Sequence, residues 1–261
     1  MKRLKYLLKG FCLARWPRMY WAARELAKGR LEPELELIEP LCPSGATFLD
    51  VGANWGAYSF YAIRAGRAVH AFEPQARLAG VLQRGLGKQG LQIHNTAVSD
   101  GAGSSELRVP RNDIGYSTIE LANRLEGTAD LRHGVETLMV ETVRLDDLDL
   151  GPVSLVKIDV EGHEGAVLAG ARVLLERDAP SLIVEVEDRN KEGARDAVCE
   201  FLSDLGYSCF VYFNGRLHAQ AALQSSRRNL IFIHPKRRAA VSAALFAEAP
   251  AATPAALASL N

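Results

Sequence analysis

The fold of this chain is decided by the stretch Phe48-Leu49-Asp50-Val51-Gly52-Ala53-Asn54-Trp55-Gly56. Mostly apolar residues from Thr47 to Val51 predict a buried strand, and the glycines after it predict a tight turn into a helix over Ala57 to Ala65. Glycine lets a ligand approach the backbone closely, and the unpaired amides at the start of a helix attract an anion. The stretch therefore predicts a ligand-binding loop after the first strand of an α/β sheet.

The rest of the chain alternates short β-branched runs with longer helical stretches. Strands are predicted over 47–51, 68–72, 91–98, 153–160, 182–186, 208–213 and 229–234, and helices follow over 75–87, 166–176 and 195–205. Residues 100–152 interrupt this rhythm with glycines and polar segments, and 135–145 alternates like a strand with one exposed face. We expect a Rossmann-like α/β fold with a seven-stranded, mostly parallel sheet, helices on both faces and a β-hairpin insertion.

Both ends of the chain differ from this central domain, which we place at 46–238. The first thirty residues carry nine Lys or Arg side chains against the single acid Glu25, interleaved with apolar residues and broken at Pro17. Residues 1–45 are thus predicted to be a basic helical extension, which either packs on the domain or rests, through residues 1–30, on an anionic membrane surface. The low-complexity segment 239–261 is expected to be a disordered tail.

Bulk composition excludes several classes of protein. The 261 residues are 48% hydrophobic and 24% charged with a formal net charge of zero, so nucleic acid is not an expected partner. The four cysteines form no Cys-x-x-Cys pair, which argues against a zinc site and a disulfide framework. No apolar run is long enough to span a membrane. We expect a cytoplasmic protein, peripheral at the inner membrane face if the extension binds lipid, and its oligomeric state is not predicted.

A second motif narrows the ligand. Glu73, in Ala71-Phe72-Glu73-Pro74, follows the second predicted strand about twenty residues after the loop, where its carboxylate can accept both hydroxyls of a ribose. The loop lacks the Gly-x-Gly-x-x-Gly spacing that a pyrophosphate requires, which disfavours a dinucleotide-dependent oxidoreductase. The acid at Asp50 favours S-adenosylmethionine, because the ammonium of that cofactor prefers an acid nearby.

Six motifs in this order resemble the FkbM-type methyltransferases. They are Asp50-Val51-Gly52-Ala53-Asn54-Trp55-Gly56-Ala57-Tyr58-Ser59, Ala71-Phe72-Glu73-Pro74, Asn95-Thr96-Ala97-Val98-Ser99-Asp100, Gly115-Tyr116-Ser117-Thr118, Val143-Arg144-Leu145-Asp146-Asp147-Leu148 and Val156-Lys157-Ile158-Asp159-Val160-Glu161-Gly162-His163-Glu164. The resemblance covers roughly residues 46–187, with a weaker match at 229–233.

This resemblance implies a class I methyltransferase fold with strand order 3-2-1-4-5-7-6 and S-adenosylmethionine as methyl donor. It also implies O-methylation of a sugar, a glycan or a secondary metabolite. The cofactor residues that it implies are Asp50, Gly52, Asn54 and Gly56 at the methionine end, Tyr58 and Ser59 near the methionine carboxylate, Glu73 at the ribose and Ala97 beside adenine.

Candidate catalytic residues follow the fourth strand of the parallel sheet. Transfer of a methyl group to a hydroxyl needs alignment and removal of the hydroxyl proton, by a general base or by a divalent metal. Asp159, Glu161 and His163 are the candidates for the base. The alternative to a base is a magnesium or manganese site, formed by Asp159 and by Glu185 at the end of the fifth strand. Without any catalytic role, Asp159 and Glu161 could instead cap the helix that follows.

Candidate acceptor-binding residues are Tyr116, Ser117 and Glu185, since hydroxyls, an aromatic face and an acid suit a sugar. A surface turn accounts equally well for Tyr116 and Ser117. The sequence therefore predicts an S-adenosylmethionine-dependent O-methyltransferase. The alternatives are a non-catalytic or membrane-associated binding module of the same fold and, with less support, a dinucleotide-dependent oxidoreductase.

Overall fold

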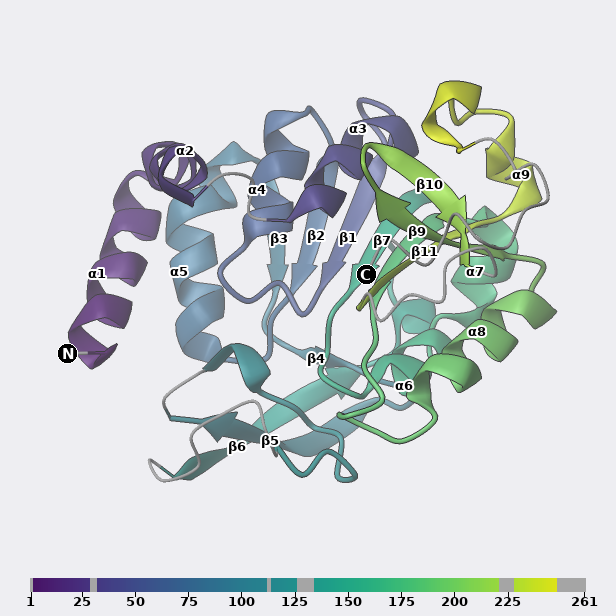
Figure 1. The fold of residues 1–261 in the computed structure, drawn as a ribbon. Coiled ribbons are helices and arrows are strands. Elements are labelled where there is room, and N and C mark those ends of the chain that lie inside the picture. The colour runs from purple at the N-terminus through teal and green to yellow at the C-terminus, as the bar shows by residue number, and fades with distance from the viewer. Residues whose placement is uncertain (1, 29–31, 112–113, 126–133, 221–227, 248–261) are drawn as a thin grey trace, which may run out of the picture.

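The predicted strands pair into one mixed sheet, which lies between two layers of helices in the computed structural model (Figure 1). The structure describes residues 2–28, 32–111, 114–125, 134–220 and 228–247. The strands of the main sheet are β1 (Thr47–Val51), β2 (Ala68–Phe72), β3 (Leu91–His94), β7 (Val153–Ile158), β8 (Ser181–Glu185), β9 (Ser208–Phe213), β10 (Arg216–Ala219) and β11 (Asn229–Ile233). Their spatial order is β10-β9-β11-β8-β7-β1-β2-β3, parallel from β3 to β8 and antiparallel beyond β8.

This order contains the predicted seven-strand arrangement, so the class I methyltransferase fold is confirmed. The eighth strand, β10, was not predicted. It forms a hairpin with β9 through Asn214 and Gly215, whose φ angles of 49° and 76° suit a tight two-residue turn.

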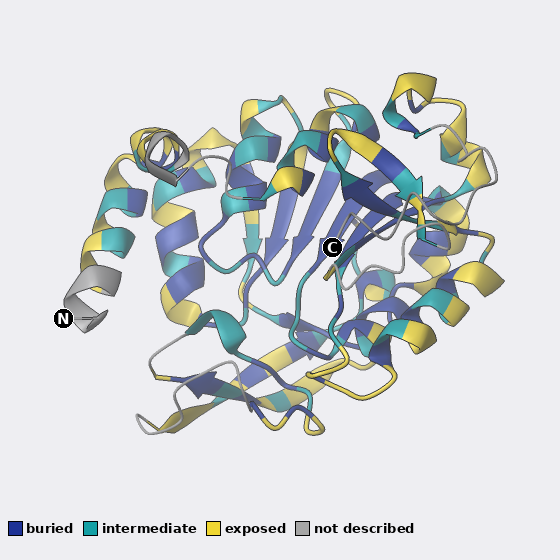
Figure 2. Ribbon diagram, in the orientation of Figure 1, coloured by how far each residue is buried: buried dark blue, intermediate teal, exposed yellow. Residues whose placement is uncertain are grey.

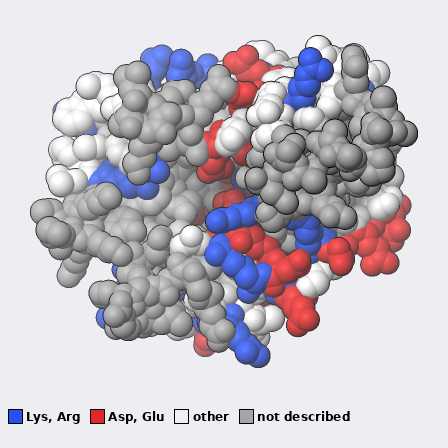
Figure 3. Space-filling view, in the orientation of Figure 1, with Lys and Arg blue, Asp and Glu red and all other residues white. Residues whose placement is uncertain are grey.

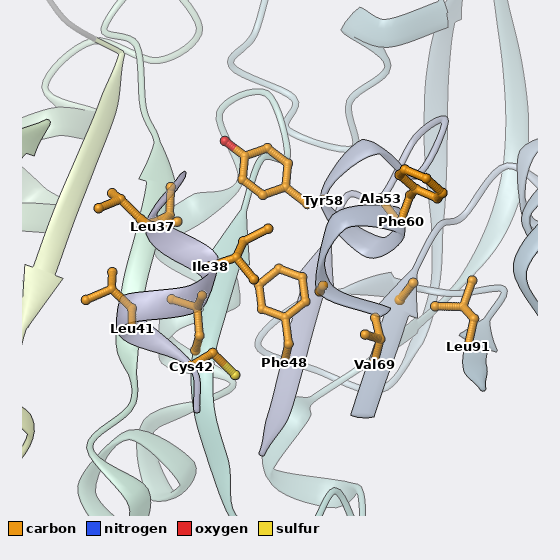
Figure 4. Packing of buried hydrophobic residues seen from close by; sticks show 14 of the residues in the cluster. Leu37, Ile38, Leu41, Cys42, Phe48, Ala53, Tyr58, Phe60, Val69 and Leu91 are labelled. Atoms are coloured by element: carbon orange, nitrogen blue, oxygen red, sulfur yellow. The ribbon is translucent and has the colours of Figure 1, made fainter. Parts of the chain in front are cut away.

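Helices cover both faces of the sheet, as predicted. They are α1 (Lys2–Arg15), α2 (Pro17–Lys28), α3 (Ile38–Leu41), α4 (Ala57–Arg64), α5 (Ala76–Leu86), α6 (Glu164–Ala169), α7 (Arg172–Asp178), α8 (Ala194–Asp204) and α9 (Pro235–Arg238). Successive strand residues face opposite layers: Phe48 lies on the side of α3 and α4 (Figure 4), whereas Leu49 belongs to the cluster under α6 to α8. The strands are buried and the outer helix faces are exposed (Figure 2).

The predicted insertion forms a second, smaller sheet. Its strands are β4 (Ala97–Val98), β5 (Gly103–Pro110) and β6 (Val135–Val143), in the order β4-β6-β5. The antiparallel pair of β5 and β6 confirms the hairpin, and β4 adds a parallel strand to it.

Two predicted elements are each divided in two. The strand expected over 91–98 ends at His94, because the Asn95 side chain turns back and donates hydrogen bonds to the carbonyl oxygens of Glu73 (2.9 Å) and Pro74 (3.0 Å). The helix expected over 166–176 breaks at Gly170, where a Cβ atom would lie 2.0 Å from the carbonyl oxygen of Ser99. Both breaks depend on contacts between segments that are distant in sequence.

The N-terminal extension is helical and docked, with its break at Pro17 as predicted. Helix α1 packs against α5, and it passes so close to Gly85 that a Cβ there would lie 2.6 Å from the carbonyl oxygen of Leu13. Within the described part of the chain, no helix has the length and apolar character needed to cross a membrane. Membrane contact by residues 1–30 stays a prediction.

The tail prediction is wrong for its first residues. Val241 and Phe246 are buried, and Phe246 forms a bridge to Leu217 of β10, a strand that the sequence analysis had not found. Residues 248–261 lie outside the described residues, and for them disorder stays a prediction.

Candidate functional site

The glycine loop after β1 holds the ends of two strands together. Gly52 has a φ of 79°, and a Cβ on it would lie 1.9 Å from the carbonyl oxygen of Asp159, just beyond β7. Gly56 has a φ of 78°, and a Cβ there would lie 2.4 Å from the Leu82 side chain of α5. Gly52 thus permits the approach of the two strand ends, and Gly56 permits the packing of α4 on α5.

Asp50 fixes the first turn of α4. Its Oδ2 accepts hydrogen bonds from the backbone N–H (2.9 Å) and the hydroxyl (2.6 Å) of Ser59. Burial raises the pKa of Asp50 to about 6, although both bonds from Ser59 lower it. The Ser59 side chain is fully buried and holds Asp50 against the first turn of α4, and its role at the methionine carboxylate stays a prediction.

Glu73 is held by the loops that follow β1 and β2. Its carboxylate accepts backbone hydrogen bonds from Asn54 and Gln75, both at 2.8 Å. Burial raises the pKa of Glu73 to about 7, while the two amides oppose this shift. Each carboxylate oxygen keeps a further lone pair, so this side chain is oriented and still able to accept from a ligand hydroxyl.

Glu73 lies in a cavity between the strand ends and the insertion, which we call the Glu73 cavity. Of the predicted site residues, it is lined by Gly52, Asn54, Glu73, Ala97, Ser117, Asp159 and His163. Phe72 and Val98 add apolar surface, and Leu107 and Ile119 close the cavity from the second sheet.

Two predicted residues take different places from those expected. Ser117 accepts a hydrogen bond from Gln75 Nε2 (3.2 Å) and donates one to the Ile114 carbonyl (2.8 Å), so it belongs to the Glu73 cavity. His163 Nε2 lies 2.9 Å from the Ser99 hydroxyl, and burial lowers the pKa of the imidazole. His163 lines the Glu73 cavity but does not line the second cavity described next.

The second cavity, of about 230 Å³, is called here the Lys157 cavity. The predicted residues on its wall are Asp50, Gly52, Asn54, Tyr58 and Asp159, and it also includes Lys157, Glu32 and, from α1 and α2, Lys9, Trp21 and Arg24. Among the described residues, Gly52, Asn54 and Asp159 are the ones that line both cavities. Acidic and basic side chains lie next to one another in the middle of the face seen in Figure 3.

Lys157 is the most unusual residue of this site, because it is an ammonium within the fully buried strand β7. Its Nζ lies 3.9 Å from Asp159 Oδ2 and 3.8 Å from Glu185 Oε2, and it donates a hydrogen bond to Asn229 Oδ1 at 3.2 Å. Burial lowers its pKa, but the two carboxylates outweigh burial and the net shift is upward. Lys157 therefore stays charged.

The proposed metal ligands Asp159 and Glu185 thus flank an ammonium. Among the described residues, no group of three or more His, Cys, Asp or Glu side chains is arranged to hold a metal ion. The interpretation of these two acids as a magnesium or manganese pair is therefore replaced by an ion-pair cluster around Lys157.

Five predicted residues line neither cavity: Gly56 and Ser59 of the loop and α4, and Glu161, Tyr116 and Glu185. Glu161 has a φ of 52°, and its carboxylate accepts from Asn190 Nδ2 at 2.8 Å. Burial and the Glu185 charge raise its pKa to about 7. The Tyr116 ring lies against Arg189, with 5.6 Å between ring centroid and guanidinium carbon.

A family model described as the methyltransferase FkbM domain matches residues 50–209. The chain belongs to the FkbM methyltransferase family. The match contains the loop, Glu73, Lys157 and Asp159, and it ends before the residues of β10 and β11. It also begins after Lys9, Trp21, Arg24 and Glu32, so these four residues of the Lys157 cavity lie outside the matched region.

Two relatives each match almost 200 residues of this chain. The methyltransferase sdnD of Sordaria araneosa is 30% identical over 197 residues, which cover 63% of this chain and 74% of sdnD. The AMB antimetabolite synthetase AmbE of Pseudomonas aeruginosa is 30% identical over 198 residues, but the chain spans only 9% of that protein.

Solved methyltransferases show lower similarity. The FkbM methyltransferase of Methylobacillus flagellatus KT is 14% identical with a TM-score of 0.48, covering 88% of this chain and 59% of that one. Magnesium protoporphyrin IX methyltransferase of Synechocystis PCC 6803 was solved with bound S-adenosylmethionine. It is 14% identical with a TM-score of 0.44, and the match covers 77% of this chain and 76% of that one. The predicted enzyme class, a methyltransferase, is confirmed by the family match.

In this FkbM methyltransferase, alanine at Gly52 is expected to be more harmful than alanine at Gly45. Both glycines have a φ of 79°, but a Cβ at Gly45 meets nothing within 4 Å. Gly45→Ala should lower the free energy of unfolding by about 1–2 kcal/mol through backbone conformation alone, and Gly52→Ala by about 1–3 kcal/mol more. Urea denaturation of both variants measures the difference. Equal losses of unfolding free energy in the two variants would show that the ends of β1 and β7 can move apart at no energetic cost.

Proposed function

We propose that this chain transfers a methyl group from S-adenosylmethionine to a hydroxyl of a sugar, a glycan or a secondary metabolite. When bound, the cofactor supplies a methyl group on a sulfonium, between an adenosine and an amino acid. The observation that carries the proposal is the junction of the two cavities at Gly52, Asn54 and Asp159. S-adenosylmethionine has an adenosine end and an amino-acid end that differ chemically, so each end suits one cavity and the sulfonium between them would lie at the junction.

The Glu73 cavity suits the nucleoside end. The oriented carboxylate of Glu73 accepts the ribose hydroxyls, and the apolar surface of Phe72, Ala97 and Val98 lies beside the base. The Lys157 cavity suits the amino-acid end, because it contains both acidic and basic side chains. These assignments fit the donors and acceptors present in each cavity.

Asp159 is the group in our proposal that removes the proton from the acceptor hydroxyl. Its side chain is 36% exposed and lines both cavities, so an acceptor can reach it. Desolvation raises its pKa well above the ordinary value, and Lys157 only partly opposes this shift. A carboxylate with a raised pKa is a stronger base than an ordinary one. Lys157 and Glu185 position it through the ion-pair cluster.

The likeness to part of an antimetabolite synthetase supports a secondary metabolite within the proposed acceptor class. The test is a screen with S-adenosylmethionine labelled in the methyl group, against hydroxylated metabolites and glycans, with and without a chelator. We expect label on a hydroxyl oxygen, with no loss in chelator because Lys157 lies between the two acids. Failure of the folded wild type to bind either S-adenosylmethionine or S-adenosylhomocysteine would contradict the proposal.

A further inference from the structure

The N-terminal helices form part of the wall of the Lys157 cavity. Lys9 comes from α1, and Trp21 and Arg24 come from α2. Their positions are set by packing, because Leu13 and Trp21 are each 3% exposed and belong to the core cluster that contains β1 and α4. The extension is thus in contact with the place where the proposed cofactor would bind.

Arg24 and Trp21 present hydrogen-bond donors that no protein group satisfies. The Arg24 guanidinium forms no ion pair within the described residues, and its Nε is buried without a partner. The Nε1 of the buried Trp21 is likewise without one. Both groups donate only, and buried donors without an acceptor are destabilising. Arg24 lines the cavity, and its charge without an ion-pair partner among the described residues favours an anion there.

Two further features of the same cavity favour an anion near Arg24. The Lys9 ammonium lies 4.1 Å from the centroid of the Trp55 ring, on the cavity wall. Helix α4 begins in the wall at Ala57 and Tyr58, while the next amide, of Ser59, is already bound by Asp50. A helix N-terminus carries partial positive charge that attracts a carboxylate.

Acids lie on the other side of the cavity, together with the Lys157 ammonium beside Asp159. Glu32 Oε2 accepts the Tyr58 hydroxyl at 2.7 Å, and Asp159 lies at the junction with the Glu73 cavity. The cavity thus combines a cationic wall from α1, α2 and the start of α4 with an acidic wall from Glu32 and Asp159. An amino-acid zwitterion, with its carboxylate and its ammonium on one carbon, has the matching pair of charges.

We propose that Arg24, assisted by Lys9, binds the carboxylate of the methionine part of S-adenosylmethionine, so that the N-terminal extension completes the cofactor site. This inference rests on the function proposed above. It assigns a binding role to residues that lie outside the matched family region.

The test compares S-adenosylmethionine with its decarboxylated analogue by titration calorimetry, without any methyl acceptor. Arg24→Gln should weaken binding of S-adenosylmethionine by about 10- to 100-fold, the range of a hydrogen bond to a charged group. The same variant should leave the affinity for the decarboxylated analogue within about twofold, because that ligand has lost the partner of Arg24. Arg18→Gln, at an exposed position of the same helix, is the matched control and should change neither affinity.

Each other outcome overturns the inference in a recognisable way. Unchanged affinity for S-adenosylmethionine in a folded Arg24→Gln variant would reject the role of Arg24 at the cofactor carboxylate and leave the proposed function intact. Arg24 would then be free to bind an anionic methyl acceptor. Equal weakening of both ligands would show that Arg24 acts through the packing of α2; circular dichroism and the thermal midpoint monitor that packing. Absence of binding by the wild type would reject the proposed function as well.

The outward side of the same two helices carries an independent observation. Five of the nine exposed large hydrophobic side chains among the described residues lie there: Leu7, Leu8, Phe11, Trp16 and Met19. Phe11 and Trp16 touch edge to face, with 6.0 Å between ring centroids, and Arg15 and Arg18 are exposed beside them. An apolar patch with basic neighbours and no acid but Glu25 in the first thirty residues complements an anionic bilayer.

We infer that this patch binds the surface of membranes that contain anionic lipid. The full chain should sediment with vesicles of phosphatidylcholine and phosphatidylglycerol and much less with phosphatidylcholine alone. Replacement of Phe11 and Trp16 by Ser should weaken binding by about tenfold or more. Leu121→Ser, at a side chain 81% exposed elsewhere, should not change binding. Absence of vesicle binding by the wild type, or a dimer that the double variant converts to a monomer, would overturn this inference.

Discussion

Asparagine in place of Asp159 is expected to lower kcat by about 10²- to 10⁴-fold, while the dissociation constant of S-adenosylmethionine changes by less than about tenfold. The Asp159 carboxyl lines both cavities, and desolvation raises its pKa. Asparagine keeps the shape and a hydrogen-bonding oxygen, but it cannot take a proton. The measurement is a steady-state assay on the acceptor found in the labelling screen, together with calorimetry of the cofactor.

The pH profile separates loss of a base from loss of binding. A general base acts when deprotonated, so wild-type kcat/KM should fall as the pH drops through the raised pKa of Asp159, and Asp159→Asn should lack this acidic limb. Glu161→Gln is the matched control, because Glu161 also has a raised pKa, about 7, but lines neither cavity. A loss confined to cofactor affinity would instead make Asp159 a ligand of the cofactor ammonium.

The glycine loop after β1 could be predicted from sequence because its geometry is local. The apolar run before Gly52 defines β1, the glycines define the turn, and Glu73 follows at the end of the neighbouring strand. In a parallel sheet these two positions must meet at one edge. The structure adds a detail that spacing could not give, namely the hydrogen bond from the Asn54 amide to Glu73.

The residues of the Lys157 cavity were harder to predict, for two different reasons. The sequence did mark Lys157, because it is the only charged residue in the strand Val153–Ile158. The catalytic prediction was instead placed on Asp159 and Glu161, the acids that follow the strand. Arg24 had no signal in the sequence, because tertiary packing, of α1 on α5 and of α2 on α4, brings α2 to the loop. The hairpin of β9 and β10 also had a sequence signal, because Asn214-Gly215 is a dipeptide typical of two-residue hairpin turns.

Methionine in place of Lys157 is expected to lower the free energy of unfolding at pH 8 by about 3–5 kcal/mol. Methionine fills similar space, but the carboxylates of Asp159 and Glu185 then lose the ammonium that lies 3.9 and 3.8 Å from them. Asn229 Oδ1 also loses its donor. Urea denaturation of the two proteins without ligand measures the difference.

The pH dependence of this loss identifies its cause. Without the ammonium, the pKa of Asp159 rises further in the folded state and keeps its ordinary value in the unfolded state, so the folded variant binds more protons. Its stability must then fall as the pH rises from the ordinary carboxyl pKa through the raised one, and the deficit should be larger at pH 8 than at pH 5. Glu185→Gln added to Lys157→Met removes one of the two carboxylates that have lost the ammonium, the one that Arg228 still faces at 3.8 Å, and should recover about 1 kcal/mol at pH 8. The opposite result is a loss of unfolding free energy that is the same at pH 5 and pH 8 and that Glu185→Gln does not reduce. It would mean that Lys157 stabilises β7 through packing, and that the two acids need no cation between them.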